Sequence, residues 1–226
     1  MLKIFDRALR ILGKPMKKKV LACFVGIDGS GKTTVAKALD ASLRQAGISS
    51  TYIWCGWRGF ESWLFKPFAA LTKNAMIKRG NERGVASAHE RIPFFDYLTW
   101  LDYFVRVCPA LVASSLTRTI LIVDRYVYDV IQELHGEDTA SRRMVTWLMR
   151  LFPQPTVIFY VKVPPEVAYA RKDDIPSLEF LYRSEEEKQK LLKELYANRV
   201  IVLDGTRTVQ ELTQDALKIV TALVNE

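Results

Sequence analysis

The stretch that decides the fold runs from Val20 to Thr34 and reads VLACFVGIDGSGKTT. Within it, Gly26–Thr33 matches the pattern GxxxxGK[ST] in full, which is the signature of a phosphate-binding loop. The apolar residues before the motif predict a buried strand, and Lys32–Ala46 has the apolar spacing of a helix. Because the motif needs a strand before it and a helix after it, a chance glycine-rich turn is the weaker interpretation.

The residue types of this loop suit the binding of a polyphosphate. Glycines let the backbone curl so that successive N–H groups face inward, and the following helix presents its positive end to the same anion. Lys32 adds a mobile positive charge, and the Thr33 hydroxyl can bind Mg²⁺. The loop residues that we expect to contact a nucleotide are Gly26, Gly29, Ser30, Gly31, Lys32, Thr33 and Thr34.

Outward from the loop, short β-branched apolar runs alternate with longer helical patterns, which indicates an α/β fold with a parallel sheet. The predicted strands are Val20–Gly26, Thr51–Cys55, Thr119–Val123, Thr156–Val163 and Arg199–Leu203. The predicted helices are Lys32–Ala46, much of Glu61–Lys78, Ala86–Leu116, Ala140–Leu151, Pro165–Arg171, Glu185–Tyr196 and Val209–Val224. A helical insertion at about 59–118 is expected to build the substrate pocket, because such excursions lie beyond the carboxyl ends of the strands.

A second element, Thr119–Asp124, is an apolar strand that ends in a carboxylate. An aspartate at a strand tip suits the Walker-B position beside the Mg²⁺ shell, so Thr33 and Asp124 are the candidate metal ligands. Arg125 follows at once, and its guanidinium can clamp a transferring phosphoryl group. The alternative for Arg125 is an ion pair with Asp124 or Asp129.

A third element combines a strand end, two prolines that start a short helix, and the basic pair Arg171-Lys172. Either Arg171 or Lys172 can close over the nucleotide as a lid at about 171–184, where it supplies charge and excludes water. A solvated charged turn is the alternative. Ser184 then has the spacing of a cap for a helix that begins at Glu185.

The chain has 226 residues and a formal charge of +8, but the positive charge is concentrated at one end. Residues 1–19 hold seven basic residues against one acidic residue and carry +6 of that charge. The remainder is close to neutral, so a basic nucleic-acid-binding domain is disfavoured. On a helical wheel, residues 2–14 separate basic from apolar side chains. This fits docking on the protein's own body or a partner, binding to an anionic membrane surface, or, less well, a presequence.

Three cysteines, Cys23, Cys55 and Cys108, lie in apolar contexts without the spacing of a metal site or a disulfide framework. The apolar run Val20–Ile27 is far shorter than the ~20 residues that span a bilayer. It leads directly into the phosphate loop without a signal-peptide cleavage site. We therefore expect a cytoplasmic protein.

Taken together, these motifs resemble the thymidylate kinase family of P-loop nucleoside monophosphate kinases. The matching segments, in the family's order, are Phe24–Thr34, Asp124-Arg125-Tyr126, Val163–Glu166 with Arg171, and Val202–Thr206 followed by Val209–Leu212. The loop and the Asp-Arg-Tyr triplet are fairly specific as a pair, and the other segments are weak singly. The resemblance covers the chain from residue 20 to the C-terminus, which divides it into a basic segment at 1–19 and a kinase domain at 20–226.

The resemblance implies a three-layer P-loop fold with a five-stranded parallel sheet in the order 2-3-1-4-5. It implies phosphoryl transfer from ATP–Mg²⁺ to an acceptor phosphate, and a homodimer. The catalytic residues that it implies are Asp28, Lys32, Arg125 and Arg171. Asp28 is expected near the nucleotide, the acceptor phosphate and the metal, Arg171 is the lid arginine, and the adenine rests at the turn of Asp204 and Gly205.

The chain departs from the family where the acceptor should bind. After the second strand it reads WCGWRGF over Trp54–Phe60 in place of a Pro-Gly or Pro-Glu stretch, which leaves Arg58 to grip a phosphate. The family's Asp-Arg pair is at best Asp102-Tyr103, with Arg106 as the replacement arginine. The candidate acceptor-binding residues are Arg58, Asp102, Tyr103, Arg106, Arg125 and Tyr126. The aromatic residues that are candidates for stacking on a base or sugar are Trp57, Tyr97 and Tyr103.

The sequence therefore favours ATP- and Mg²⁺-dependent phosphoryl transfer to a nucleoside monophosphate, with dTMP as the leading acceptor. Two alternatives stay open. The same fold can act on a different phosphorylated or hydroxylated metabolite, for which a membrane surface is one setting. It can also use ATP as a switch without metabolic turnover. The lid arginine and the large pocket insertion argue against this alternative, because a switch needs neither.

Overall fold

The computed structural model describes residues 19–56, 65, 95–117, 120–129, 143, 147–148, 150–173 and 175–225. Several predicted features lie outside these residues. They are the amphipathic helix at 2–14, the helix at 61–78 apart from Phe65, the first nine residues of the helix at 86–116, most of the helix at 140–151, the arginine Arg58 and the tryptophan Trp57.

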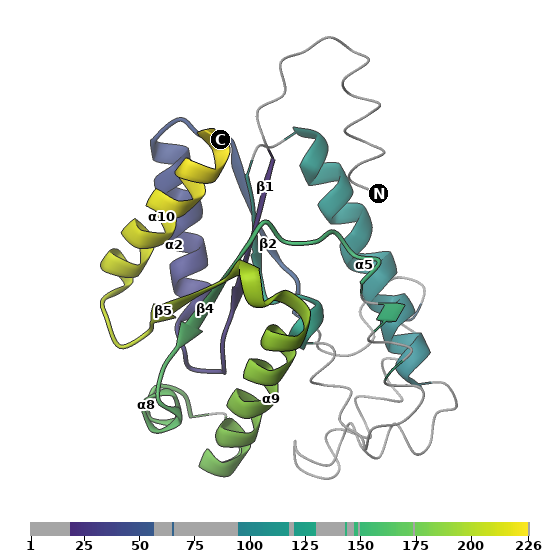
Figure 1. Ribbon diagram of the computed structural model, residues 1–226, viewed down its shortest axis with the longest axis vertical. Coiled ribbons are helices and arrows are strands. Elements are labelled where there is room, and N and C mark those ends of the chain that lie inside the picture. The colour runs from purple at the N-terminus through teal and green to yellow at the C-terminus, as the bar shows by residue number, and fades with distance from the viewer. Residues whose placement is uncertain are drawn as a thin grey trace.

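Five parallel strands form one sheet at the centre of the molecule (Figure 1). The strands are β1 (Val20–Val25), β2 (Ser50–Trp54), β3 (Ile120–Asp124), β4 (Val157–Lys162) and β5 (Val200–Asp204). Their order in the sheet is β2-β3-β1-β4-β5. The predicted fold class and strand order are thereby confirmed, and the predicted strands agree with the observed ones to within one residue at each end.

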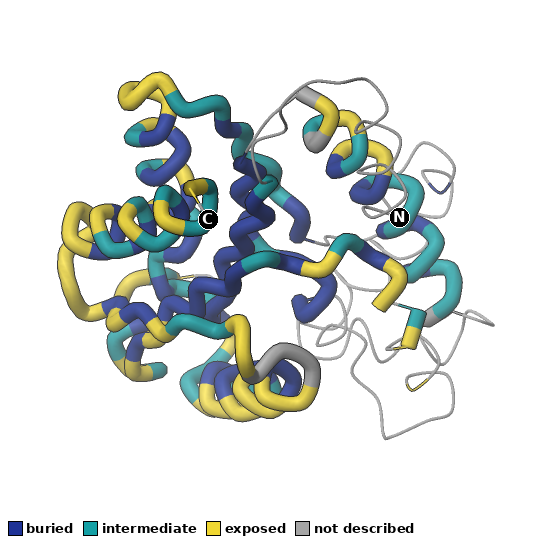
Figure 2. Tube along the Cα trace, turned by 45° about the horizontal axis from the view of Figure 1, so that its top comes forward, coloured by how far each residue is buried: buried dark blue, intermediate teal, exposed yellow. Residues whose placement is uncertain are grey.

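The three central strands, β1, β3 and β4, are buried on both faces of the sheet, which explains why they read as apolar runs, whereas the edge strands β2 and β5 are partly exposed. All residues of β1 are buried. Successive side chains of a strand point to opposite faces, so Cys23 packs into the core beneath α5 (Phe95–Thr117) and Phe24 into the core beneath α2 (Lys32–Gln45). Figure 2 shows this buried sheet between helices whose outer sides are exposed.

Helices cover the sheet from both sides and give three layers (Figure 1). On one face, α2 packs against α10 (Val209–Asn225). On the other lie α5 and α9 (Leu178–Tyr196), whose buried residues join the core of that face. The short helix α8 (Pro165–Ala170) follows β4, and a 3-10 turn, η1 (Ala197–Arg199), precedes β5. No helix within the described part of the chain is long and apolar enough to cross a membrane.

The predicted start of α9 is wrong. The helix begins at Leu178 instead of Glu185, and Ser184 lies inside it. The Ser177 hydroxyl accepts a hydrogen bond from the Phe180 N–H at 3.1 Å, as a capping side chain does. The spacing of Ser184 imitated a cap, but Leu181 is fully buried and continues the apolar face of the helix toward its true start.

Candidate functional site

The candidate site lies where the carboxyl ends of the central strands meet. The phosphate loop follows β1, the Asp-Arg-Tyr triplet ends β3, and α8 follows β4. Because β1 lies between β3 and β4 in the sheet, these segments come together at one edge of the fold. This is the edge at which open α/β sheets bind ligands.

Close packing explains the glycines of the loop. Gly29 and Gly31 have φ of 82° and 88°, in the left-handed region that favours glycine. A Cβ atom at Gly29 would also lie 2.3 Å from the carbonyl oxygen of Ala168 in α8. At Gly31 nothing lies within 4 Å of the equivalent position. The loop therefore needs Gly29 for both its conformation and its contact with α8, and Gly31 for conformation alone.

Lys32 begins α2 and lies folded over the loop. Its Nζ donates to the Ile27 carbonyl at 3.0 Å and to Asp28 Oδ1 at 3.4 Å. The side chain is only 4% exposed. Burial, together with nearby Arg125, lowers the pKa of Lys32 to about 8, although Asp28 acts in the opposite direction. An anion that replaced these partners would favour the charged form of the lysine.

Asp28 is the point on which the cations of the site converge. Its carboxylate contacts Lys32, forms an ion pair with Arg125, and lies 3.7 Å from Lys172 Nζ. Burial opposes ionisation, but Lys32, Arg125 and Lys172 outweigh it and hold the pKa of the Asp28 carboxyl well below its usual range. Three cations of the site are thus paired with one carboxylate.

Arg125 is held by carboxylates on two sides. In addition to Asp28, its Nη1 lies 3.5 Å from Asp129 Oδ1. Its φ is 64°, and it is the one described residue other than glycine with a positive φ. Burial opposes protonation, but Asp129 and Asp28 raise the pKa of the guanidinium above its ordinary value. Left-handed backbone at a residue with a side chain is costly and concentrates at functional sites.

Asp124 ends β3 as a fully buried carboxylate. Its Oδ2 accepts a hydrogen bond from the Tyr52 hydroxyl at 2.7 Å, while its Oδ1 is buried without a hydrogen-bond partner among the described residues. Thr33, the other candidate metal ligand, is half-buried in the first turn of α2. The described residues include no group of three or more His, Cys, Asp or Glu that could hold a metal ion by itself.

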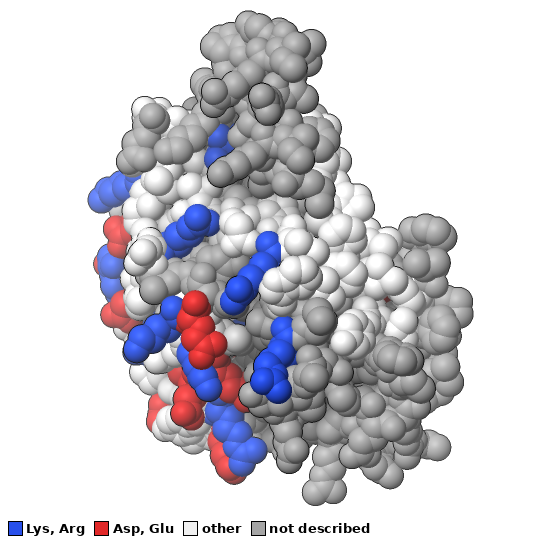
Figure 3. Space-filling view, turned by 45° about the vertical axis from the view of Figure 1, so that its right-hand side comes forward, with Lys and Arg blue, Asp and Glu red and all other residues white. Residues whose placement is uncertain are grey.

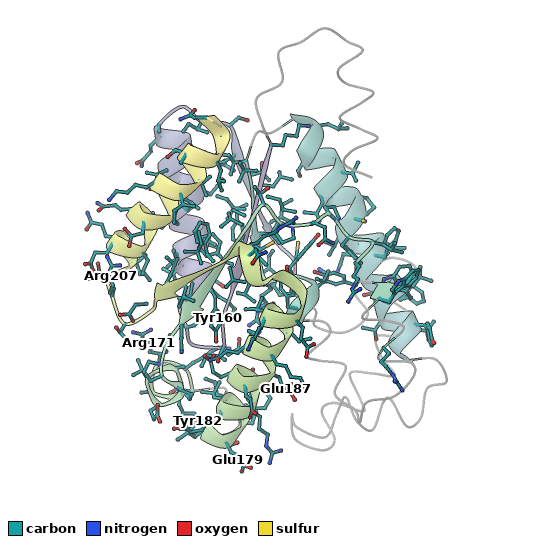
Figure 4. The ribbon with its side chains drawn as sticks, in the orientation of Figure 1. Tyr160, Arg171, Glu179, Tyr182, Glu187 and Arg207 are labelled. Atoms are coloured by element: carbon teal, nitrogen blue, oxygen red, sulfur yellow. The ribbon has the colours of Figure 1, made fainter. Side chains whose placement is uncertain are left out.

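The two candidate lid residues make different contacts. Arg171 Nη1 donates to the Gly205 carbonyl at 3.1 Å, and Figure 4 shows Arg171 between α8 and the turn after β5. That turn is closed by Asp204, whose Oδ1 accepts from the Thr206 N–H at 3.0 Å. Lys172 instead faces Asp28. The structure thus brings Arg171 to the predicted adenine turn and Lys172 to the phosphate loop.

The candidate acceptor residues of the described chain are mostly packed into the interior. Tyr103 and Tyr126 are buried, and their hydroxyls donate to the carbonyls of Cys55, at 2.9 Å, and Pro153, at 2.8 Å. Asp102 is buried in α5, and Tyr97 is half-buried. Arg106 Nη2 donates to the Gly56 carbonyl at 2.6 Å, and its guanidinium lies over the Trp54 and Tyr103 rings. Acceptor binding by these residues stays a prediction.

Two residues of the site were not predicted. Tyr52 orients Asp124 from β2, and Lys188 reaches Asp129 from α9 at 2.7 Å. The ion pair of Arg125 with Asp129, which was an alternative for that arginine, is confirmed. The signal that could have found Lys188 is its spacing: it follows the apolar Leu181 by seven residues and so shares its buried face.

The described surface carries charges of both signs. On the face shown in Figure 3, Lys and Arg side chains intermingle with Asp and Glu over the described residues and form no single basic stripe there. Near the site, three cationic side chains instead gather around the Asp28 carboxylate. This arrangement suits a small anion better than a nucleic-acid backbone.

Comparison with known proteins agrees with this geometry. No family model matches the chain. A thymidylate kinase of Leptospira interrogans serogroup Icterohaemorrhagiae serovar copenhageni is 24% identical over 218 residues, which cover 90% of this chain and 94% of that protein. The chain is a distant homologue of thymidylate kinases.

Other thymidylate kinases match over a similar extent. A probable thymidylate kinase of Staphylothermus marinus is 25% identical over 206 residues, covering 86% of this chain and 91% of that protein. The thymidylate kinase of Plasmodium falciparum is 25% identical over 216 residues, or 92% of each chain. The match is therefore nearly full-length, and it confirms the resemblance to thymidylate kinases that the motifs indicated.

Proposed function

We propose that this chain is a kinase that transfers a phosphoryl group from ATP–Mg²⁺ to a nucleoside monophosphate, with dTMP as the leading acceptor. The observation that carries the proposal is the convergence of Lys32, Arg125 and Lys172 on Asp28 at the phosphate loop. Phosphoryl transfer needs in-line positioning and neutralisation of charge more than it needs a strong base, and the clustered cations support the neutralisation of charge. Distant homology to thymidylate kinases supports the choice of acceptor class.

In this proposal the cations exchange one anion for another. Lys32 and Arg125 are held by carboxylates of the chain, so a phosphate that takes over these contacts keeps each cation paired. The N–H groups of the loop and the N-terminus of α2 bind the same phosphates. Arg171 and Lys172 extend the positive charge from the adenine turn to the loop, where closure excludes water.

The buried carboxylate of Asp124 fits the Mg²⁺ that such a reaction needs. Its Oδ1 has no hydrogen-bond partner among the described residues, and Tyr52 fixes the other oxygen. Thr33 and Asp124 would hold the ion together with phosphate oxygens and water, as is usual for Mg²⁺. When bound, Mg²⁺ neutralises the charge that develops on the β- and γ-phosphates.

A second candidate is a kinase for a different phosphorylated or hydroxylated metabolite. The observation that favours it is the packing of Tyr103, which stands where the thymidylate kinase pattern has an arginine. Its ring lies in the core and its hydroxyl binds the Cys55 carbonyl. The nearby Arg106 is held by a backbone carbonyl. This region can therefore recognise an acceptor that differs from dTMP.

The decisive experiment is a coupled assay of ADP release with a panel of nucleoside monophosphates, sugars and alcohols. Lys32→Ala serves as the blank, and Lys218→Ala, which removes an exposed lysine of α10, serves as the matched control. We expect turnover with a nucleoside monophosphate in the wild type and in the control only. ADP release restricted to a non-nucleotide acceptor would replace the proposal with the second candidate. ATP binding without stimulation by any acceptor would indicate a switch.

A further inference from the structure

A buried ion pair joins α9 to the segment that follows β3. Lys188 Nζ lies 2.7 Å from Asp129 Oδ1, and the two side chains are 3% and 4% exposed. They are separated by 59 positions in the sequence. Burial of two charges is costly even when they are paired, so such a pair is poorly explained by stability alone.

Asp129 connects this pair to the phosphate site. Its Oδ1 also faces Arg125 Nη1 at 3.5 Å, and its Oδ2 accepts a hydrogen bond from the Tyr126 N–H at 3.2 Å. The carboxylate thus fixes both the side chain of Arg125 and the backbone that follows it. Since Arg125 in turn contacts Asp28, a continuous chain of charges runs from α9 to the loop.

Helix α9 is itself held firmly against the sheet and the loop. Leu181 packs in one apolar cluster with Ile27 of the loop. One turn on, Glu185 accepts a hydrogen bond from the hydroxyl of Tyr160 in β4, which Figure 4 labels. Lys188 follows on the same face, because residues four and seven positions apart lie above one another on a helix. The contacts of α9 therefore fix the position from which the Lys188 ammonium reaches Asp129.

We propose that Lys188 is a positioning residue of the phosphate site, which balances the charge of Asp129 and so keeps the Arg125 guanidinium available to phosphate. The inference rests on the proposed function, under which Arg125 binds a phosphate. Without Lys188, Asp129 would face Arg125 as an unbalanced carboxylate. It would draw the guanidinium toward itself and offset the positive potential at the loop.

The test measures anion binding and stability separately. We would titrate Lys188→Met, the double variant Asp129→Asn/Lys188→Met and the control Lys193→Met, an exposed lysine of the same helix, with inorganic pyrophosphate by calorimetry. Each variant is first checked for folding by circular dichroism and thermal unfolding. We expect Lys188→Met to weaken pyrophosphate binding about tenfold, as one unbalanced charge near the site would. The double variant should recover most of this loss, and the control should match the wild type.

The outcomes separate a positioning role from a structural one. If Lys188→Met lowers the unfolding temperature but the folded protein binds pyrophosphate as the wild type does, the pair is structural and the inference is wrong. If Lys188→Met does not fold, the double variant carries the test, and a double variant that binds pyrophosphate about tenfold more weakly than the wild type would overturn the inference. Wild-type protein that binds no pyrophosphate would overturn it as well. The titrations use pyrophosphate and no acceptor, so they test the role of Lys188 separately from kinase turnover. Absence of turnover would refute the proposed function without deciding the role of Lys188.

Discussion

Two regions of the molecule use positive charge in different ways: the phosphate side, which comprises the loop at Gly26–Thr33 with Arg125 and its partners, and the α5 side, which comprises α5 with Tyr103 and Arg106. Arg125 lies between the carboxylates of Asp28 and Asp129, whereas Arg106 donates to the Gly56 carbonyl and lies over two aromatic rings. A phosphate can replace a carboxylate as the partner of a cation at little cost. A backbone carbonyl that loses its donor stays behind unsatisfied. The phosphate side is therefore arranged for exchange of anions, and the α5 side for fixed packing.

The comparison is tested most strongly by removing the two arginines in turn. Under the proposed function, in which Arg125 binds the transferred phosphoryl group, Arg125→Ala should lower kcat about 10²–10³-fold, because a preorganised donor would be lost. Arg125→Gly should lose as much activity but be about 1 kcal/mol more stable than Arg125→Ala, since glycine accepts the φ of 64° at this position. ADP release and denaturant unfolding measure the two effects. If Arg106→Ala lowered kcat as much as Arg125→Ala does, Arg106 would not serve packing alone, and the difference between the two sides would be refuted.

A matched pair of glycine substitutions separates contact from conformation within the loop. Both Gly29 and Gly31 have a positive φ, but only at Gly29 would a Cβ atom meet the Ala168 carbonyl. Gly29→Ala should therefore weaken ADP binding about tenfold more than Gly31→Ala, as overpacking adds to backbone strain. Calorimetric titration with ADP decides the point. Equal losses would mean that α8 yields to the loop and does not constrain it.

The sheet and the loop could be predicted because their signals are local. Strands covered on both faces leave long apolar runs, and the motif from Gly26 to Thr33 specifies a strand, a turn and a helix within a few residues. The start of α9 could not be predicted from cap spacing, because Ser184 imitates a cap, while Ser177, whose hydroxyl accepts from the Phe180 N–H, follows Ile175 and Pro176. The buried apolar face that Leu181 continues is the signal that extends toward the true start.

The partners within the site could not be predicted, because they depend on contacts between distant segments. Lys188 and Asp129 are 59 positions apart, and Tyr52 and Asp124 are 72 apart. The spacing of Lys188 from Leu181 places it on the buried face of its helix, but nothing in the local sequence shows that its partner is Asp129. The burial of Tyr103 was hidden for a similar reason: its partner is a carbonyl at the end of β2, not another motif.

The pH dependence of nucleotide binding should report Lys32. The pKa of Lys32 is lowered to about 8, while a bound phosphate favours the ammonium form. Above pH 8, binding must therefore take up a proton, and the affinity for ADP should fall by up to about tenfold per pH unit. Calorimetry from pH 7 to 9.5 measures this. Lys32→Met should bind weakly with no such slope, and an equal slope in that variant would assign the titration to another group.

The smallest effect is expected on the α5 side, from Tyr103→Phe. The change removes the hydroxyl that donates to the Cys55 carbonyl and leaves the buried ring in place. An unsatisfied buried carbonyl should lower the free energy of unfolding by about 1 kcal/mol. The KM for ATP should not change, because the phosphate side keeps all its contacts. Denaturant unfolding and ADP release measure the two quantities. A raised KM for the acceptor alone would show that this tyrosine reaches the acceptor through movement of α5. The α5 side, like the phosphate side, would then exchange an internal partner for the substrate.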